Sequence, residues 1–236
     1  MGQAACQCLH PVCADVAREM GDERAMQIEH LPRVGGRVCL DFANTIEGRA
    51  GAQAREYLCS YTDLVTWSRV VGLLPHEAAQ GLLVAAAAQP ATAARILTSA
   101  RGLREAIYSV FAAVAARQDP DGTAIAALNQ AMTMALAHVQ VVRIADQFRW
   151  AWREQAAALD GMLWPVACSA AVFLTSPDVE RVRECPGDDC NWLFVDDSRN
   201  RRRRWCSMQM CGDKVKARRY YARQRDLREG GKPQGA

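Results

Sequence analysis

The chain has 236 residues, of which 50% are hydrophobic and 23% charged, a composition typical of a soluble globular protein with one core and a small second domain. The net charge of +3 is unevenly divided, because residues 1–180 carry 14 basic and 18 acidic side chains, whereas residues 181–236 carry 15 basic and 8 acidic ones. The positive charge at the C-terminal end favours an acidic partner there.

Neither a membrane span nor a secretory leader is expected. The most apolar stretch, residues 161–175, is interrupted by Pro165 and is shorter than the roughly 20 residues that cross a bilayer. Residues 1–30 contain five acidic side chains and lack the basic start and apolar run of a signal peptide. A cytoplasmic location follows, in which the ten cysteines are metal ligands and reduced thiols rather than disulfides.

Both ends of the chain are predicted to be tails, disordered over residues 1–30 and flexible over residues 231–236. The first contains three cysteines and a histidine within eight residues, Cys6, Cys8, His10 and Cys13. Such a cluster could bind a metal. We prefer a tail and assign the cluster no role.

Residues 31–176 are predicted to form an α-rich α+β domain with a small antiparallel sheet. The alternating pattern of residues 37–42 predicts a strand that leads into a helix or turn start at Asn44 and Thr45. A second alternating pattern predicts a hairpin over residues 139–152, with three aromatic side chains on one face, Phe148, Trp150 and Trp152.

Helical spacing fills most of the rest of this domain. Prolines and turn residues divide it into predicted helices over residues 60–74, 76–88, 90–117, 123–137 and 157–175. The last helix is expected to kink near Pro165. A short joint at residues 176–178 then leads into a second domain, residues 177–230, and should hold it near the first.

Polar residues of the first domain allow two interpretations. Six side chains could line a pocket for a small polar effector: Arg37, Asp41, Asn44, Thr45, Trp67 and Arg104. Alternatively, Asp41 and Asn44 cap a helix and tie the strand end down through hydrogen bonds to the backbone. We favour the second interpretation because capping is the commonest use of such residues.

Two cysteine pairs dominate the second domain. Cys185 and Cys190 are separated by four residues, as are Cys206 and Cys211, and fifteen residues lie between the pairs. Two short loops of this kind can bring four thiolates to one tetrahedral ion, so we predict one structural Zn²⁺. Zinc would act by folding the domain, which is too small to bury enough apolar surface alone.

The residues around the cysteines predict their local structure. Residues 191–195 are aromatic and β-branched and are followed by a turn signal, which predicts a short hairpin carrying the first pair. Good helix formers follow Asp213 up to Arg225, so the last ligand should lie at a helix start. This order of knuckle, hairpin and helix is treble-clef-like.

Basic residues follow the cysteines closely. Between residues 199 and 225 there are 11 lysines and arginines and a single acid, Asp213. A surface on which nearly all charges are positive favours binding to the phosphate backbone of a nucleic acid. The candidate nucleic-acid-binding residues are Arg199, Arg201, Arg202, Arg203, Arg204, Lys214, Lys216, Arg218, Arg219 and Arg225.

The four cysteines occur within a denser set of residues, namely 192–194, 197–201, 203–208, 211–214, 216–218 and 220–221. This set resembles the CGNR-type zinc finger. Upstream, residues 35–45, 61–64 with Trp67, and 103–106 resemble the ABATE domain that precedes this finger in bacterial proteins. The resemblance spans roughly residues 30 to 228 and implies a stress-induced transcription regulator.

The signature tetrapeptide departs from the family at two positions. It reads Cys211-Gly-Asp-Lys214, with acid and lysine where the family has asparagine and arginine. Lysine offers a point charge where arginine can form two parallel hydrogen bonds to phosphate or guanine. The zinc ligands are unaffected, so the departure concerns the contact at the helix start.

We expect a non-enzymatic, DNA-binding transcription regulator. No histidine follows residue 138, which argues against the nuclease chemistry of some related zinc folds. The larger domain would sense a small-molecule effector or form a homodimer, and a contact with RNA polymerase would supplement a single finger. The alternative is an RNA-binding or protein-interaction module whose aromatic side chains stack on bases or pack on a partner, namely Trp192, Phe194, Tyr220 and Tyr221. We prefer the interpretation that Trp192 and Phe194 form the small core of the finger.

Overall fold

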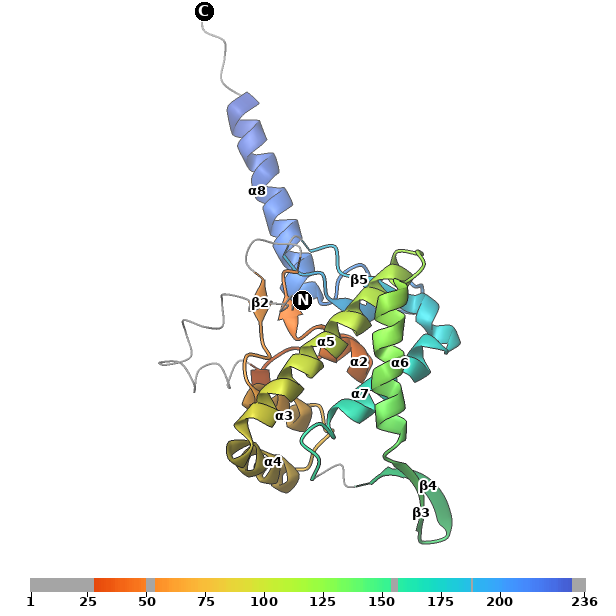
Figure 1. Cartoon of the computed structure of the whole chain (residues 1–236). Helices are drawn as coiled ribbons and strands as arrows, with labels where there is room; N and C mark the ends of the chain where they lie inside the picture. Colours follow the sequence, from red (N-terminus) through yellow and green to blue (C-terminus); the bar gives the residue numbers. More distant parts are fainter. Residues whose placement is uncertain (1–27, 50–53, 154–156, 188, 231–236) are drawn as a thin grey trace, which may run out of the picture.

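The computed structural model (Figure 1) describes residues 28–49, 54–153, 157–187 and 189–230. The cysteine and histidine cluster of the first 13 residues and the predicted tail at 231–236 lie outside the described residues, as do the side chains of Arg219 and Arg225. Ile28 is buried, and its carbonyl accepts a hydrogen bond from Leu31. Residues 28–30 therefore belong to the folded part and not to the predicted tail.

The first domain is built around one long helix, α5, which packs against α2, α3, α4, α6 and α7. Pro90 begins α5, where its missing N–H costs nothing. Ala100, Leu103, Ile107 and Phe111 repeat at helical spacing and face the core. The predicted helices between Ser60 and Leu136 are confirmed as α3 (Tyr61–Val70), α4 (His76–Ala88), α5 (Pro90–Ala115) and α6 (Gly122–Leu136).

The strand predicted at residues 37–42 is wrong, because Val38–Ala43 forms a short helix, α2. Four of its six residues are buried, since α5, α7 and β6 surround it. A helix satisfies its own backbone hydrogen bonds, whereas a strand in this place would need a partner strand. The turn predicted at Asn44 and Thr45 is present, and a two-residue ladder follows between β1 (Ile46–Glu47) and β2 (Arg55–Glu56).

The predicted kink at Pro165 is also wrong. Helix α7 begins only at Leu163 and runs to Leu174, so the proline lies in its first turn. The backbone N–H groups of a first turn have no partner within the helix, and proline is tolerated there.

The predicted aromatic hairpin is confirmed as β3 (Val139–Ile144) and β4 (Gln147–Trp152), which pair antiparallel. Ile144 pairs with Gln147, which leaves a two-residue turn in which Ala145 has a φ of 54°. Figure 1 shows the hairpin projecting from the helical body. None of the helices in the described part of the chain is long and apolar enough to cross a membrane.

The C-terminal part begins with a 3₁₀ helix, η2 (Pro177–Arg181), and a second hairpin, β5 (Val182–Glu184) with β6 (Leu193–Val195). It ends in one π-helical turn, η3 (Met208–Gly212), and in α8 (Asp213–Gly230), which extends away from the body in Figure 1. The residues of β6 are buried and contact α2 and α5. The larger domain and this module therefore share one hydrophobic core.

Candidate metal centre

The first cysteine pair lies in the loop that joins β5 to β6. The N–H of Cys185 donates to the carbonyl of Trp192 at 2.8 Å, and the N–H of Cys190 donates to the carbonyl of Gly187 at 3.1 Å. A Cβ added to Gly187 would lie 3.1 Å from the Cβ of Cys190 and 3.4 Å from the sulfur of Cys211. The loop thus closes tightly over the second pair.

The second cysteine pair spans the start of the C-terminal helix. Cys206 is buried, and Cys211 lies in the η3 turn that runs directly into α8. Ser207 caps this turn, since its side chain accepts a hydrogen bond from the N–H of Met210 and its carbonyl accepts one from the N–H of Cys211. The predicted position of the last ligand at a helix start is confirmed.

The sulfur atoms of all four cysteines lie within 4.8 Å of one another. The sulfur of Cys206 is 3.5 Å from that of Cys190 and 3.6 Å from that of Cys211, too far for disulfides. A tetrahedral zinc ion with Zn–S bonds of about 2.3 Å places its ligands roughly 3.8 Å apart. The four thiols therefore fit one structural zinc ion after small adjustments.

The cluster favours a negative charge on one sulfur, that of Cys185, while the pKa values of the other three thiols are raised. Hydrogen bonds from the thiols of Cys190 and Cys206 lower the pKa of Cys185 to about 2, although burial acts in the opposite direction. Burial raises the pKa of the Cys211 thiol. Because zinc binds thiolates, the remaining protons would leave as the ion enters.

Comparison with known families covers both parts of the chain. Residues 181–224 match the CGNR zinc finger. Residues 36–177 match ABATE, described as "Putative stress-induced transcription regulator". The chain belongs to the ABATE family. Both resemblances seen in the sequence are confirmed, and no curated protein matches the chain.

The CGNR finger is held against the ABATE domain by hydrogen bonds from buried side chains. The amide of Asn44 pairs with the backbone of Leu193 in both directions, accepting from its N–H and donating to its carbonyl, each at 2.8 Å. The indole N–H of Trp192 donates to the carbonyl of Ile46 at 3.0 Å. Asn44 thus fastens the strand between the two cysteine pairs to the end of α2.

Three more of the candidate pocket residues also form contacts within the protein. Asp41 accepts a hydrogen bond from the N–H of Gly35 at 2.9 Å, and Thr45 donates to the carbonyl of Phe42 at 2.8 Å. The ring of Trp67 packs on that of Phe42 in the core. These contacts are of the kind expected if side chains tie the backbone down.

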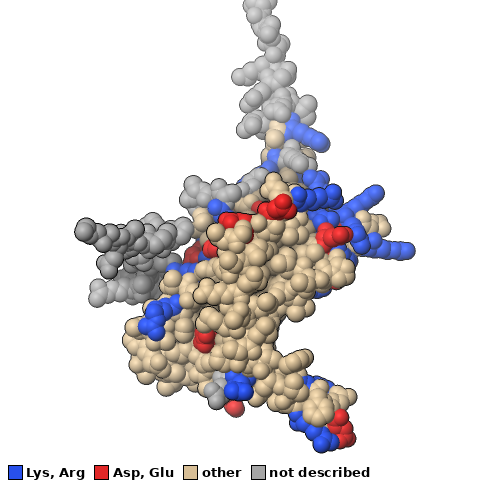
Figure 2. Space-filling model, turned by 45° about the vertical axis from the view of Figure 1, so that its right-hand side comes forward, with Lys and Arg blue, Asp and Glu red and all other residues tan. Residues whose placement is uncertain are grey.

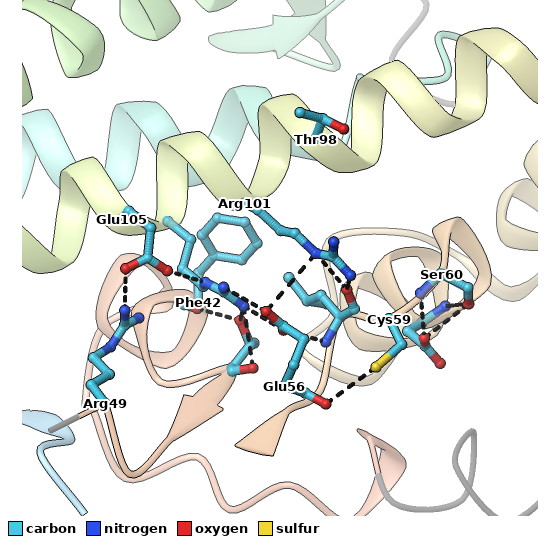
Figure 3. A network of polar contacts seen from close by, with 12 residues as sticks. Phe42, Arg49, Glu56, Cys59, Ser60, Thr98, Arg101 and Glu105 are labelled. Carbon is cyan, nitrogen blue, oxygen red and sulfur yellow. Dashed lines mark hydrogen bonds and ion pairs between the residues drawn. The ribbon is translucent and has the colours of Figure 1, made fainter. Parts of the chain in front are cut away.

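The two remaining candidates, Arg37 and Arg104, have different partners. Arg37 is exposed, forms an ion pair with Asp178 at 3.3 Å and covers the ring of Phe173. Arg104 is buried and bound to Glu56 within a polar network beneath α5, shown in Figure 3. The structure therefore engages all six candidates in internal contacts and does not gather their polar groups around one ligand site.

We expect Asn44→Ala to lower the free energy of unfolding by about 2–4 kcal/mol, because both backbone groups of Leu193 are left buried without partners. Urea denaturation followed by circular dichroism measures the loss. Thr98→Ala, an exposed change on α5, is the control and should cost less than about 0.5 kcal/mol. A loss of only about 1 kcal/mol for Asn44→Ala, the usual cost of a lost cap, would contradict the two-way pairing.

Four of the predicted basic residues are exposed in the loop after β6. We call them the arginine cluster: Arg199, Arg201, Arg202 and Arg204. Among the described residues, none of these four guanidiniums forms an ion pair. The ion pairs described in the finger involve Arg181, Arg203, Lys216 and Arg218. In Figure 2, Lys and Arg side chains gather beside the base of α8.

A cleft of 330 Å³ lies at the arginine cluster. Its walls include Arg202, Arg204, Trp205 and Met208. The guanidinium of Arg204 lies over the ring of Trp205, 5.7 Å from its centre. The sequence analysis did not include Trp205 or Met208 in the candidate site, although their positions beside Cys206 could have indicated them.

Arg203 differs from its neighbours. Its guanidinium donates to backbone carbonyls of Val34, Val195 and Cys206 and lies 4.7 Å from the centre of the Phe194 ring. The side chain thus connects the finger to the ABATE domain, although Arg203 also lines the cleft at the arginine cluster. An unbroken run of arginines carries no signal for this difference.

The basic residues of α8 are partly neutralised. Lys214, Lys216 and Arg218 are exposed on its first turns. Lys216 forms an ion pair with Asp213 at 3.5 Å, and Arg218 forms one with Asp189 at 3.6 Å. The acid that departs from the family signature therefore offsets a neighbouring charge, and the arginine cluster is the stronger positive feature.

The four candidate aromatic residues separate into two pairs. Trp192 and Phe194 are fully buried and form the core of the finger, so they cannot stack on bases. Tyr220 and Tyr221 are exposed on α8, with ring centres 5.6 Å apart.

Proposed function

We propose that the protein is a transcription regulator without catalytic activity, whose CGNR finger binds duplex DNA through the arginine cluster. The ABATE domain senses a ligand or mediates association in this proposal. The observation that carries it is the arginine cluster itself, which lies beside an open cleft and has no carboxylate partner among the described residues. The treble-clef topology and a cytoplasmic location remain predictions of the same proposal.

The chemistry of the surface supports nucleic acid as the partner. Arginine forms two parallel hydrogen bonds with a phosphate or a guanine edge, and each neutralised phosphate releases counterions. The family description agrees with such a role. A catalytic role has little support, because the four thiols fit a closed structural site and no histidine follows residue 138.

Changing Arg202 and Arg204 to glutamine is expected to weaken binding to duplex DNA by about 10- to 100-fold and to reduce the salt slope by roughly 2. Fluorescence anisotropy of the zinc-loaded protein, titrated across salt concentrations, measures both quantities. The matched control changes Arg33 and Arg117, which are exposed on the ABATE domain, and removes the same charge. It should leave affinity and slope almost unchanged.

The same titration with single-stranded RNA tests the alternative function. Exposed Tyr220 and Tyr221 could stack on unpaired bases, so tighter binding to RNA than to duplex DNA would favour that function. If neither nucleic acid binds at low salt, or if the control pair weakens binding as much as the cluster pair, the proposal is wrong.

A further inference from the structure

Large apolar side chains are exposed together at the end of α6 and on the β3–β4 hairpin. We call this surface the hairpin patch, and each of its five side chains is more than half exposed: Met134, Leu136, Val141, Phe148 and Trp150. Phe148 is 74% and Trp150 is 77% exposed. Soluble monomers rarely leave so large an apolar patch in water. Some partner is therefore expected to cover it.

The register of the hairpin sets Trp150 at the middle of this patch. Trp150 pairs with Val141 across the strands and lies between Phe148 and Trp152 on the same face of β4. Trp152, at the base of the hairpin, lies against Trp164 of α7, with ring centres 6.1 Å apart. The exposed Phe148 and Trp150 thus lie on the same face of the hairpin as Trp152, which contacts the helical body.

A pocket of 240 Å³ opens at the base of the hairpin, between α5, α6 and α7. Leu103, Leu163 and Trp164 give it apolar walls, and Met134 of the hairpin patch also lines it. The patch therefore combines a projecting aromatic side chain with an adjoining apolar hollow. A surface with both features can be complementary to a second copy of itself.

The polar groups of the pocket suit an indole. Asp160 lines it and accepts a hydrogen bond from the indole N–H of Trp164 at 3.4 Å, and a carboxylate can accept several such bonds. Arg95 also lines the pocket, and a guanidinium stacks favourably on an indole ring. Among the described residues, neither Asp160 nor Arg95 forms an ion pair, so both remain available to a tryptophan from outside.

We infer that two copies of this chain associate through the hairpin patch, with Trp150 of each copy seated in the pocket of the other. The contact is symmetric, so one kind of interaction is made twice. In each copy, Phe148 and Trp150 would bury roughly 300–500 Å², and the surface of the other copy that receives them would bury about as much. Over both copies the interface therefore buries roughly 1,200–2,000 Å² in total. That is the size of a stable protein interface.

The inference deepens the association role proposed for the ABATE domain. Figure 1 shows the hairpin at the end of the molecule opposite α8, so the contact leaves both arginine clusters free. Two linked fingers would bind DNA more tightly than one, because the second contact becomes intramolecular. The association itself needs no nucleic acid, and it is tested without any, so its failure and failure of DNA binding are separate results.

Sedimentation velocity of the zinc-loaded chain is expected to show a dimer at micromolar concentration. Trp150→Ser should weaken the dimer by about 30-fold or more, as for the central residue of an interface. The matched control is Val84→Ser, which alters another exposed apolar residue on α4 and should leave the dimer intact. Unchanged circular dichroism would show that each variant is folded.

A second variant tests the pocket. Ser99→Trp fills it from an exposed position on α5 and should also give monomers. Mixing this variant with Trp150→Ser should restore one of the two contacts, because the first still has Trp150 and the second still has an open pocket, so mixed dimers should form more tightly than dimers of either variant alone and less tightly than the wild-type dimer. The inference is overturned if the wild-type chain stays monomeric at about 100 µM, well above the Kd of specific interfaces, if Trp150→Ser dimerises normally, or if Ser99→Trp has no effect.

Discussion

Cys190→Ser, or removal of zinc with a chelator, is expected to unfold the CGNR finger and to lower the melting temperature of the ABATE domain by about 10 °C or more. Zinc in finger peptides contributes about 10–16 kcal/mol to folding, more than this small module can replace. When the finger unfolds, Leu193 and Trp192 leave the shared core, and the side chain of Asn44 loses both of its hydrogen bonds to Leu193. The larger domain therefore loses stability although none of its own residues has changed.

Differential scanning calorimetry with and without zinc measures this coupling. Cys168→Ala is the control, because its thiol lies on α7 outside the metal cluster, and it should leave the zinc dependence of melting unchanged. If the ABATE domain melts at the same temperature with and without zinc, the finger is an independent unit and the shared core contributes nothing. Retained zinc in Cys190→Ser would refute the ligand set itself.

Local patterns predicted most of the helices and the metal ligands. Pro75, Pro90 and Gly122 mark the starts of α4, α5 and α6. A proline or a turn residue begins or ends a helix within a few residues of its own position, so these boundaries can be recognised in the sequence. The zinc ligands could be predicted in the same way, because the four residues between the two cysteines of each pair form one short loop. Elements whose signals are local could therefore be assigned before any fold was known.

Contacts that depend on distant residues could not be predicted in this way. Segment 38–43 is buried by α5, α7 and β6 together, so its apolar residues lack the one-sided period that identifies a surface helix. Asn44 and Leu193 are 149 positions apart, and nothing near either residue indicates the other. Arg203 has the same local sequence signal as Arg202 and Arg204, yet only its guanidinium bridges the two domains.

Arg104→Met is expected to lower the free energy of unfolding by about 3–5 kcal/mol, because the largely buried carboxylate of Glu56 then keeps, as its ion pair, only the longer one with Arg101 at 3.9 Å. The guanidinium is 3% exposed and binds both carboxylate oxygens, at 2.5 and 2.7 Å. Burial alone would lower the pKa of Arg104, but hydrogen bonds and the charge of Glu56 outweigh it and raise that pKa. The charged pair is thus stable only while both members are present.

The neighbouring Glu105 provides a matched control for this pair. It accepts a hydrogen bond from the same guanidinium at 2.9 Å, but its side chain is half exposed. Glu105 also pairs with Arg49, whose side chain is only 12% exposed. Because glutamine keeps an oxygen that accepts hydrogen bonds and this position is half exposed, Glu105→Gln should cost about 1–2 kcal/mol, less than Arg104→Met. If Arg104→Met costs no more than this control in urea denaturation, burial does not set the strength of the network.

The double variant Arg104→Met with Glu56→Leu distinguishes the value of the pair from the cost of breaking it. Apolar side chains of similar volume often replace a buried ion pair with little loss, so the double variant should be more stable than Arg104→Met alone. A coupling energy of about 2 kcal/mol or more is expected from the double-mutant cycle. Additive losses would mean that each side chain is needed for other contacts, such as the bond from Leu58 N–H to Glu56, and that the ion pair does not determine the stability of this region.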